Sequence, residues 1–130
     1  MKVAELIRLC CDLVDRQLNR THSYSESNYQ NALIHYLLSN SDPKTTICRE
    51  VNIVYRLANG FVFGSGRADI IIESEKDCFI LELKANVDGK HIKKYFGQCA
   101  RYVKHYRTNL KKTGLIVLFN CNCKPIIQML

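Results

Sequence analysis

The chain has 130 residues and a mass of 15.0 kDa, a length typical of one domain. Hydrophobic residues make up 47% of it and charged residues 24%, which excludes a disordered chain, and no apolar run approaches the ~20 residues that span a bilayer. The net charge of +7 is concentrated in residues 89–130, which hold nine basic residues and no acid, whereas residues 1–88 hold ten basic and twelve acidic residues.

Residues 2–20 predict an amphipathic helix, because apolar side chains recur there at three- and four-residue spacing. Its charged residues exclude the apolar core of a secretory signal. The polar stretch Asn19–Ser25 ends this helix. Ser23, followed by Glu26 three residues later, has the pattern of a capping box, and a second amphipathic helix is therefore expected to run to about Leu38.

The pattern then changes to that of strands. Ile47–Tyr55 alternates between apolar and polar residues, and Asn59–Gly60 is typical of a hairpin turn. The return strand is expected to start at Phe61–Phe63, to bend at Gly64 and Gly66, and to continue over Ala68–Glu73. A polar turn then leads into a third strand, Cys78–Lys84.

The strongest helical pattern comes next, over Ile92–Tyr106, after the turn signal Asp88–Gly89. Leu115–Phe119 is a continuous apolar run, typical of a strand covered on both faces. Pro125–Leu130 is a candidate for an additional edge strand. We therefore expect residues 1–130 to form a single α/β domain with a mixed sheet flanked by helices.

Charged side chains on the third strand indicate chemistry. Glu82 and Lys84 lie two residues apart and project to one side, whereas Leu81 and Leu83 face the opposite way, into a core. Such charges are costly on a buried strand unless they are paired or used. Asp69 is expected beside Glu82 on the neighbouring strand, and a bound divalent cation is the usual remedy for two adjacent carboxylates. The alternative is a purely structural salt bridge of Lys84 with either carboxylate.

Two helices supply further polar candidates. Glu26 lies three residues before Tyr29 on the apolar stripe of the second helix, so its carboxylate is expected to point inward as a third acidic ligand. Gln98 lies four residues before Tyr102, close to the apolar stripe of the last helix. For Gln98 a solvated helix position is the alternative.

These residues, in this order, resemble the PD-(D/E)XK nuclease superfamily, whose minimal core is α-β-β-β-α-β. Asp69 and, after a gap of twelve residues, Glu82–Lys84 match its D…ExK signature. Within the superfamily the chain resembles the compact GxxExxY-type domains, although Ser23 and Ala68 stand where those patterns have Gly and Pro. The resemblance covers residues 23–120 and rests on these landmarks: Glu26 with Tyr29, Arg49 with Glu50, Arg67–Asp69, Glu82–Lys84, Gln98 with Tyr102, and Gly114–Leu115 with Phe119.

The resemblance implies a restriction-endonuclease-like fold, with residues 1–20 as an extra N-terminal helix that either covers the sheet or forms a homodimer interface. It also implies a Mg²⁺- or Mn²⁺-dependent nuclease that hydrolyses DNA. The metal ion would be bound by Asp69, Glu82 and the carbonyl of Leu83, with Glu26 as a further ligand, directly or through water. Lys84 would orient the attacking water, and the supporting residues would be Gln98, Tyr102 and Glu50.

A structure-specific nuclease similar to Holliday-junction resolvases, acting in DNA repair or recombination, is a narrower version of this hypothesis. The alternative from another class is a non-catalytic DNA-binding or assembly subunit that retains the nuclease fold.

Basic side chains gather on the last helix. They recur at three- and four-residue spacing, which predicts a ridge that contacts DNA phosphates, and a solvated helix face is the alternative. Arg67 is assigned to the same contact with DNA. The residues of the ridge are Lys90, Lys94, Arg101, Lys104 and His105.

The seven cysteines are odd in number and form neither paired CxxC motifs nor a Cys–His grid. Cys10–Cys11 and Cys121-x-Cys123 lack partner pairs at zinc spacing, so a zinc site is not expected. We interpret the cysteines as free thiols in a reducing compartment and expect an intracellular protein, in the cytoplasm or nucleus wherever its DNA lies. The isolated ones are expected to pack as small apolar residues: Cys48, Cys78 and Cys99.

Overall fold

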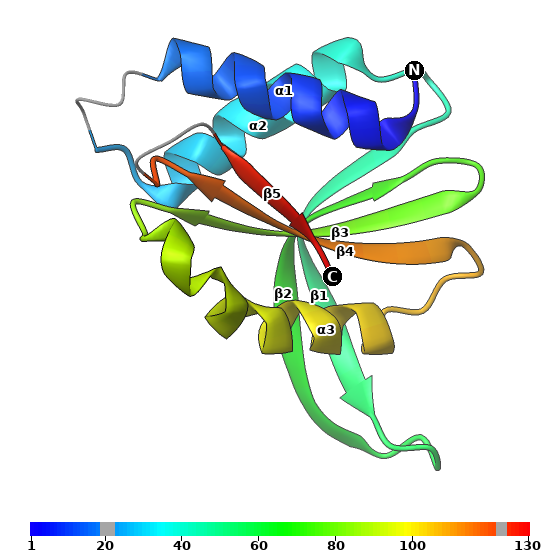
Figure 1. The fold of residues 1–130 in the computed structure, drawn as a ribbon. Helices are drawn as coiled ribbons and strands as arrows, with labels where there is room; N and C mark the ends of the chain where they lie inside the picture. The colour runs from blue at the N-terminus through cyan, green and yellow to red at the C-terminus, as the bar shows by residue number, and fades with distance from the viewer. Residues whose placement is uncertain (19–22, 122–124) are drawn as a thin grey trace.

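The computed structural model of the chain describes residues 1–18, 23–121 and 125–130. A mixed five-stranded sheet lies between two helical layers, with α1 and α2 on one face and α3 on the other (Figure 1). None of the described helices is both long and apolar enough to cross a membrane. The elements in chain order are α1 (Val3–Gln17), α2 (Glu26–Asn40), β1 (Thr46–Arg56), β2 (Val62–Glu73), β3 (Asp77–Ala85), the 3₁₀ helix η1 (Gly89–Tyr95), α3 (Phe96–His105), β4 (Lys111–Phe119) and β5 (Ile126–Met129).

The sheet has the strand order β1-β2-β3-β4-β5. Strands β3 and β4 are parallel, and every other neighbouring pair is antiparallel. Parallel neighbours need a long crossover connection, which η1 and α3 provide. The fold therefore confirms the expected α/β class with a restriction-endonuclease-like core, and β5 is the edge strand that the tail was expected to add.

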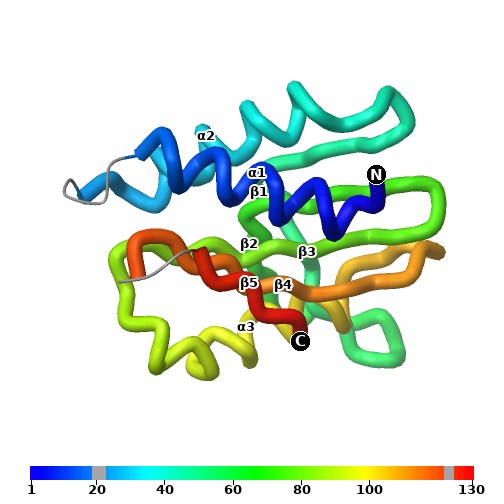
Figure 2. The backbone as a smooth tube through the Cα atoms, turned by 45° about the horizontal axis from the view of Figure 1, so that its top comes forward, coloured from blue at the N-terminus to red at the C-terminus, as the bar shows by residue number. Residues whose placement is uncertain are grey.

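The first helical layer buries its apolar stripe within the chain. In the tube view α1 and α2 run side by side over the sheet (Figure 2). Ile7 and Val14 of α1 are fully buried in a cluster that also holds Leu33 of α2 and Leu81 of β3. Helix α1 thus covers the sheet, one of the two roles expected for it. A homodimer stays a prediction, and its interface would have to lie outside this buried stripe.

The second helical layer covers the opposite side of β3 and β4. Ile80 packs with Tyr102 of α3, while Ile116 and Leu118 pack with Cys99. Central strands covered on both faces bury nearly every side chain. This explains why the sequence of β4 is a continuous apolar run and why alternate residues of β3 belong to different cores.

Strands β1 and β2 change faces midway. Ile70 belongs to the core under α1 and α2, whereas Ala68, two residues earlier, packs under α3, and in β1 the same change separates Ile47 from Val51. The change falls where Glu50 has a φ of +50°, a conformation that interrupts the regular alternation of a strand. Beyond this point the β1–β2 hairpin bends away from the sheet and passes along α3 (Figure 1).

The hairpin has the expected turn and a continuous return strand. Gly60 has a φ of +90°, and the backbone N–H of Leu57 donates to the carbonyl of Phe61 at 2.9 Å. The return strand β2 continues through Gly64 and Gly66 as expected, because both glycines remain paired with β1.

The expected capping box of α2 is wrong. The N-cap is Ser25, whose Oγ accepts a hydrogen bond from the backbone of Asn28 at 3.2 Å, while Asn28 Oδ1 accepts one from the Ser25 backbone at 3.1 Å. An Asn side chain at the third helical position reciprocates here in place of Glu, so the helix begins later than Ser23 indicates. Helix α1 ends at Gln17, and residues 19–22 of the expected break lie outside the described residues.

The expected last helix is divided into η1 and α3. His91, with φ of −107° and ψ of 24°, departs from helical geometry within η1, and Asp88 Oδ1 accepts a hydrogen bond from the Lys90 backbone at the start. The altered path lets Ile92 and Tyr95 pack against the core around Cys99. Tertiary packing therefore overrides the helical periodicity of this segment.

Candidate active site

The polar residues of β2 and β3 meet where these two strands separate. Their ladder runs as far as Ile70 opposite Leu81 and pairs no residues beyond this point, although both strands continue. There the Asp69 carboxylate takes the place of a neighbouring backbone, because its Oδ2 accepts a hydrogen bond from the N–H of Leu83 at 2.6 Å. In a regular strand the N–H and C=O of one residue point to the same side, so the Leu83 carbonyl also faces Asp69.

Glu82 is a buried carboxylate with an incomplete set of partners. Its residue is 4% exposed, and Oε1 lies 3.5 Å from Lys84 Nζ. The other oxygen, Oε2, is buried without a hydrogen-bond donor among the described residues. The pKa of Glu82 is raised from 4.5 to about 7, mainly by burial and then by the charge of Asp69, while Lys84 opposes both effects.

Asp69 experiences the same environment. Burial raises the pKa of Asp69, whereas the hydrogen bond from Leu83 and the charge of Lys84 act against that rise. The two carboxylates are close enough to share a hydrogen bond when one of them is protonated. Without a cation, this pair therefore favours holding a proton near neutral pH.

Glu26 lies at the exposed first turn of α2, so its expected inward orientation is wrong. The reason is the later start of the helix: Ser25 is the N-cap, so Glu26 is the first residue of α2. Its charge still raises the pKa of both Asp69 and Glu82, so the three carboxylates share one electrostatic environment.

Lys84 is held at the border between the core and the surface. Its side chain is 23% exposed, and Nζ lies 5.3 Å from the ring centroid of Tyr95. An ammonium over an aromatic face is attracted by the negative face of the ring. Tyr95 thus helps to orient Lys84, a role that its place in a helical apolar stripe did not indicate.

Gln98 and Tyr102 form a pair beside the carboxylates. Gln98 is half-buried and its Nε2 donates to Tyr102 Oη at 2.7 Å, so a fully solvated position does not describe it. Tyr102 is 1% exposed, and burial together with the charge of Glu82 raises the pKa of its hydroxyl. A Cβ atom at Gly66 would lie 2.6 Å from Tyr102 Cε1, so α3 packs closely on β2 only because this residue is Gly.

Two polar residues near the site were not expected from the sequence. Gln30 is 7% exposed, and its Nε2 donates to the backbone carbonyl of Asp69 at 3.4 Å, which ties α2 to the site. Asn86, with a φ of +60°, ends β3 and donates to the carbonyl of Tyr24 at 2.7 Å. In the sequence, Gln30 is a polar residue next to Tyr29, and Asn86 comes two residues after Lys84. Asn is a residue type that tolerates left-handed backbone.

The remaining polar candidates lie on the surface. Glu50 is exposed at the bend of β1, and Arg67 is exposed on β2, two residues before Asp69. The four Lys and Arg residues of the expected ridge are exposed as well, but they do not share one helix face, because Lys90 and Lys94 belong to η1 and the other two to α3. Those two residues are Arg101 and Lys104.

His105 does not belong to this ridge. It is half-buried, with its ring centroid 4.9 Å from that of Tyr55 and 5.7 Å from that of Phe63. The expected burial of the isolated cysteines is correct for Cys78 and Cys99 and wrong for Cys48, which is exposed on β1.

A family model described as the PD-(D/E)XK nuclease superfamily matches residues 2–129. The chain belongs to this superfamily. Its members are generally metal-dependent phosphodiesterases. The matched region includes α1, beyond the residues 23–120 over which the sequence landmarks extend. No curated relative matches the chain significantly.

We call the point where β2 and β3 separate the strand fork. The residues at the fork fit the divalent cation typical of the superfamily. Two carboxylates and a backbone carbonyl offer hard oxygen ligands, which Mg²⁺ and Mn²⁺ prefer. Glu82 Oε2 has no hydrogen-bond partner among the described residues and is therefore available as a metal ligand. Among the residues that the structure describes, no three His, Cys, Asp or Glu side chains gather as a metal group. Cys123 of the Cys121-x-Cys123 pair lies outside those residues.

Proposed function

We propose that this protein is a Mg²⁺- or Mn²⁺-dependent deoxyribonuclease. The observation that carries the proposal is Glu82, whose buried carboxylate has one oxygen without a hydrogen-bond donor among the described residues while it lies against Asp69 and Lys84. A structural salt bridge needs one carboxylate and one ammonium, whereas this site holds a second, half-buried carboxylate, Asp69, at the same point. The surplus negative charge matches a bound divalent cation.

The chain's own residues have distinct roles in this proposal. Asp69, Glu82 and the Leu83 carbonyl would hold the ion, which lowers the pKa of bound water and offsets charge on the phosphate. The Leu83 N–H fixes the Asp69 carboxylate, and Gln30 fixes its backbone. Lys84 orients the attacking water and stabilises the negative charge that develops on the scissile phosphate.

Residues around these four act on position and charge. Glu26 adds negative charge from the start of α2 and would contact the ion through water, because its exposed side chain is not gathered with the other carboxylates among the described residues. Gln98 and Tyr102 support the wall beside Glu82, and Glu50 sets the bend from which β1 and β2 leave the sheet. Arg67 is exposed next to Asp69 and contacts the DNA backbone.

Cleavage by a Lys84→Ala variant tests the proposal. The parent should nick supercoiled plasmid in millimolar Mg²⁺ or Mn²⁺ and not in chelator. Lys84→Ala should reduce the rate at least 100-fold, because the ammonium acts on the reacting phosphate, and should keep its affinity for DNA in chelator. Lys76→Ala, an exposed lysine in the turn before β3, is the matched control and should cut normally.

A Lys84→Ala variant that cuts at the parental rate would contradict the assignment. A parent that binds DNA but shows no metal-dependent cleavage on branched, nicked, single-stranded or duplex DNA would favour the non-catalytic subunit instead. The same panel distinguishes a nuclease similar to Holliday-junction resolvases from one that accepts any duplex.

A further inference from the structure

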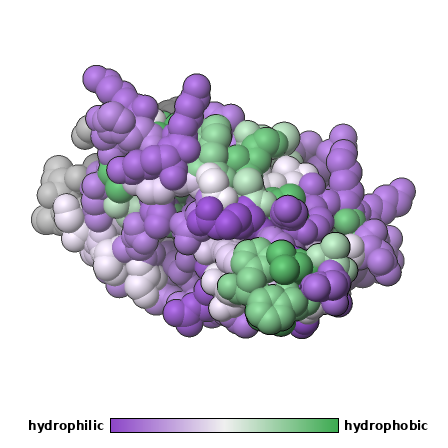
Figure 3. Space-filling view, turned by 90° about the horizontal axis from the view of Figure 1, so that it is seen from below, coloured by the Kyte–Doolittle hydropathy of each residue, from purple (hydrophilic) through white to green (hydrophobic). Residues whose placement is uncertain are grey.

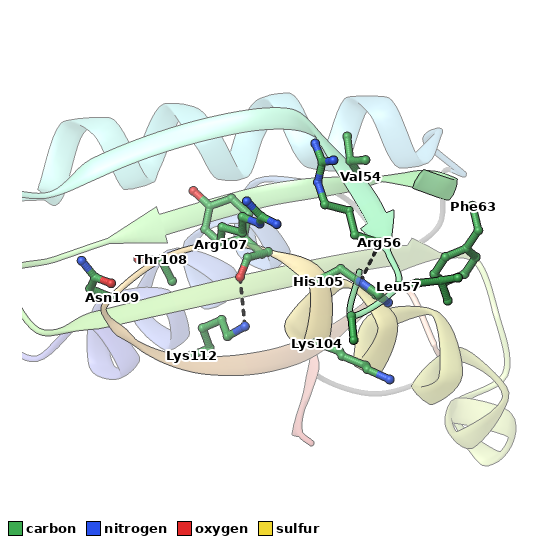
Figure 4. Close-up of a pocket in the computed structure, with 12 residues that line it drawn as sticks. Val54, Arg56, Leu57, Phe63, Lys104, His105, Arg107, Thr108, Asn109 and Lys112 are labelled. Atoms are coloured by element: carbon green, nitrogen blue, oxygen red, sulfur yellow. Dashed lines mark hydrogen bonds between the residues drawn. The ribbon is translucent and has the colours of Figure 1, made fainter. Parts of the chain in front are cut away.

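A hollow of about 750 Å³ lies between the turn end of the β1–β2 hairpin and the end of α3 (Figure 4). One wall comes from β1 and the hairpin, and the other from the segment that links α3 to β4. The two walls are joined where the backbone N–H of Arg56 donates to His105 Nδ1 at 3.3 Å. The hollow is therefore a built feature of the fold and separate from the carboxylates at the strand fork.

The charge of this hollow is entirely positive. Its lining includes four basic residues and no Asp or Glu: Arg56, Lys104, Arg107 and Lys112. The nearest carboxylate bonded to this segment is Glu73, whose two oxygens accept hydrogen bonds from Tyr106 Oη at 2.8 Å and Thr108 Oγ1 at 3.3 Å. Glu73 keeps its charge in these hydrogen bonds, but the four basic side chains outnumber it, so the net charge at the hollow is positive and matches an anionic ligand.

An aromatic platform stands at one side of the hollow. Phe63 is 54% exposed, yet its ring is held at 6.1 Å from the ring centroid of Tyr55 and nearly perpendicular to His105, at 73°. Exposed apolar residues continue it along the hairpin, and Figure 3 shows an apolar patch bordered by hydrophilic side chains on the side of the molecule seen from below. The large exposed members are Leu57, Phe61, Val62 and Phe63.

This combination favours one kind of occupant. An apolar protein partner explains the exposed rings but not four basic side chains in a lining that holds no acid. A duplex explains the charge but not the rings, because its bases are stacked on one another. Unpaired nucleotides explain both, since their phosphates need cations and their bases need flat apolar surfaces.

The platform is continuous with the site at the fork. Phe63 and Asp69 lie on the same strand, six residues apart, and an extended strand spans about 20 Å over that length. Arg67 is exposed between them. A single strand of a few nucleotides held on the platform can therefore continue toward Asp69 and Glu82.

We infer that the hairpin platform and the basic hollow hold unpaired nucleotides next to the cleavage site, which makes DNA with a single-stranded segment the substrate class; this inference rests on the proposed nuclease function. Phe63 stacks on a base, and Arg56 and Arg107 contact phosphates. The preference for unpaired DNA thus comes from the hairpin and not from the carboxylate site.

Binding without cleavage tests this inference. Anisotropy of a labelled oligothymidylate and of a blunt hairpin duplex is measured in chelator for the parent, Phe63→Ala, Phe63→Trp and Leu38→Ala. Phe63→Ala should weaken oligothymidylate binding roughly 5- to 150-fold, the effect of removing the stacking of one base, and change duplex affinity less than twofold. Phe63→Trp should restore the affinity. Leu38→Ala, at a residue 59% exposed on α2, should match the parent.

Three results would overturn the inference. Equal reductions in affinity for both ligands would assign Phe63 a general structural role. If Phe63→Ala keeps the oligothymidylate affinity and the solution mass of the parent, the apolar patch would be a binding surface for another protein. A parent dimer that Phe63→Ala converts to a monomer, with unchanged oligothymidylate affinity, would make the patch an interface between two copies. Because no cleavage is measured, this test is independent of the Lys84→Ala result: a catalytic failure with intact Phe63 dependence would remove the nuclease function and leave a single-strand binding protein.

Discussion

Glu82 shows how one residue acquires an unusual property from two layers of structure. A strand covered by helices on both faces excludes water from its carboxylate, and the separation of β2 from β3 places a second carboxylate beside it. The first condition raises the pKa of Glu82 through desolvation, and the second raises it through like charge. Alternation along β3 predicts which way Glu82 points, but the size of the shift depends on the complete burial that only the assembled layers produce.

Stability in chelator should report this shift. The unfolded chain releases the Glu82 proton near pH 4.5, whereas the folded chain keeps it to about pH 7. Between these values the folded state binds more protons than the unfolded state, so the melting temperature should fall as pH rises through this window. Above it, the ionised form is fully present in both states and the fall in stability is complete.

Glu82→Gln removes the titrating group and keeps its shape. Other carboxylates titrate in the same range, so the measured quantity is the difference in melting temperature between parent and variant from pH 4.5 to 8. That difference should grow in favour of Glu82→Gln as pH rises. Parallel curves for the two proteins would show that Glu82 is ionised normally in the fold.

At the scale of elements, the sequence predicts the existence and type of each segment better than its details. Periodicity identifies every helix and strand in order, because a period of two or of three to four residues directly reflects which faces are buried. It does not predict the division into η1 and α3 or the cap at Ser25. Those features depend on which neighbours are available in the folded protein, such as the core that receives Tyr95.

The glycines of β2 illustrate the same limit. The sequence assigns Gly64 and Gly66 to a bend in the return strand, and both remain paired with β1 inside β2. What requires glycine is close packing: a Cβ at Gly66 would overlap the Tyr55 hydroxyl and lie 2.6 Å from Tyr102 Cε1, whereas at Gly64 the nearest atom is Tyr55 Cδ2 at 3.4 Å.

Gly66→Ala should therefore destabilise the protein by about 1–3 kcal/mol, the cost typical of overpacking, and should reduce cleavage by pushing α3 and Tyr102 away from β2. Gly64→Ala is the matched control, since the same methyl group fits there at an ordinary distance, and it should change the free energy of unfolding by less than about 0.5 kcal/mol. Urea unfolding measures both. Equal effects at the two positions would assign the role to strand flexibility instead of packing.

At the scale of the whole molecule, charge separates along the chain into two regions with different partners. Asp69 and Glu82 are the carboxylates of the proposed cation site, whereas residues 89–130 hold nine basic residues and no acid. The sequence predicts this division because counting acidic and basic residues along the chain is enough to find it. It does not predict the basic hollow, since Arg56 and Lys112 are far apart in sequence and meet only because the hairpin bends along α3.

The exposed basic residues of η1 and α3 should contribute to duplex binding through phosphates alone. Lys94, Arg101 and Lys104 replaced together by Ala should weaken binding to all duplex sequences alike. The slope of log affinity against log salt should become shallower by about 0.9 for each phosphate that the variant no longer neutralises, because each neutralised phosphate releases condensed counterions. Anisotropy of one labelled duplex over a range of salt concentrations measures this slope.

The matched control removes the same charge from the opposite layer. Lys2, Arg8 and Arg16 are exposed at or near α1, on the other face of the sheet, and their replacement by Ala should leave the slope unchanged. If both triple variants flatten the slope equally, net charge alone explains the attraction and η1 and α3 are merely solvated. If only the variant of Lys94, Arg101 and Lys104 flattens the slope, DNA lies along η1 and α3, on the side of the sheet where Lys84 meets Tyr95. Charge removal changes the salt slope for any DNA, whereas Phe63→Ala weakens only unpaired DNA, so the two variants separate attraction to phosphates from recognition of exposed bases.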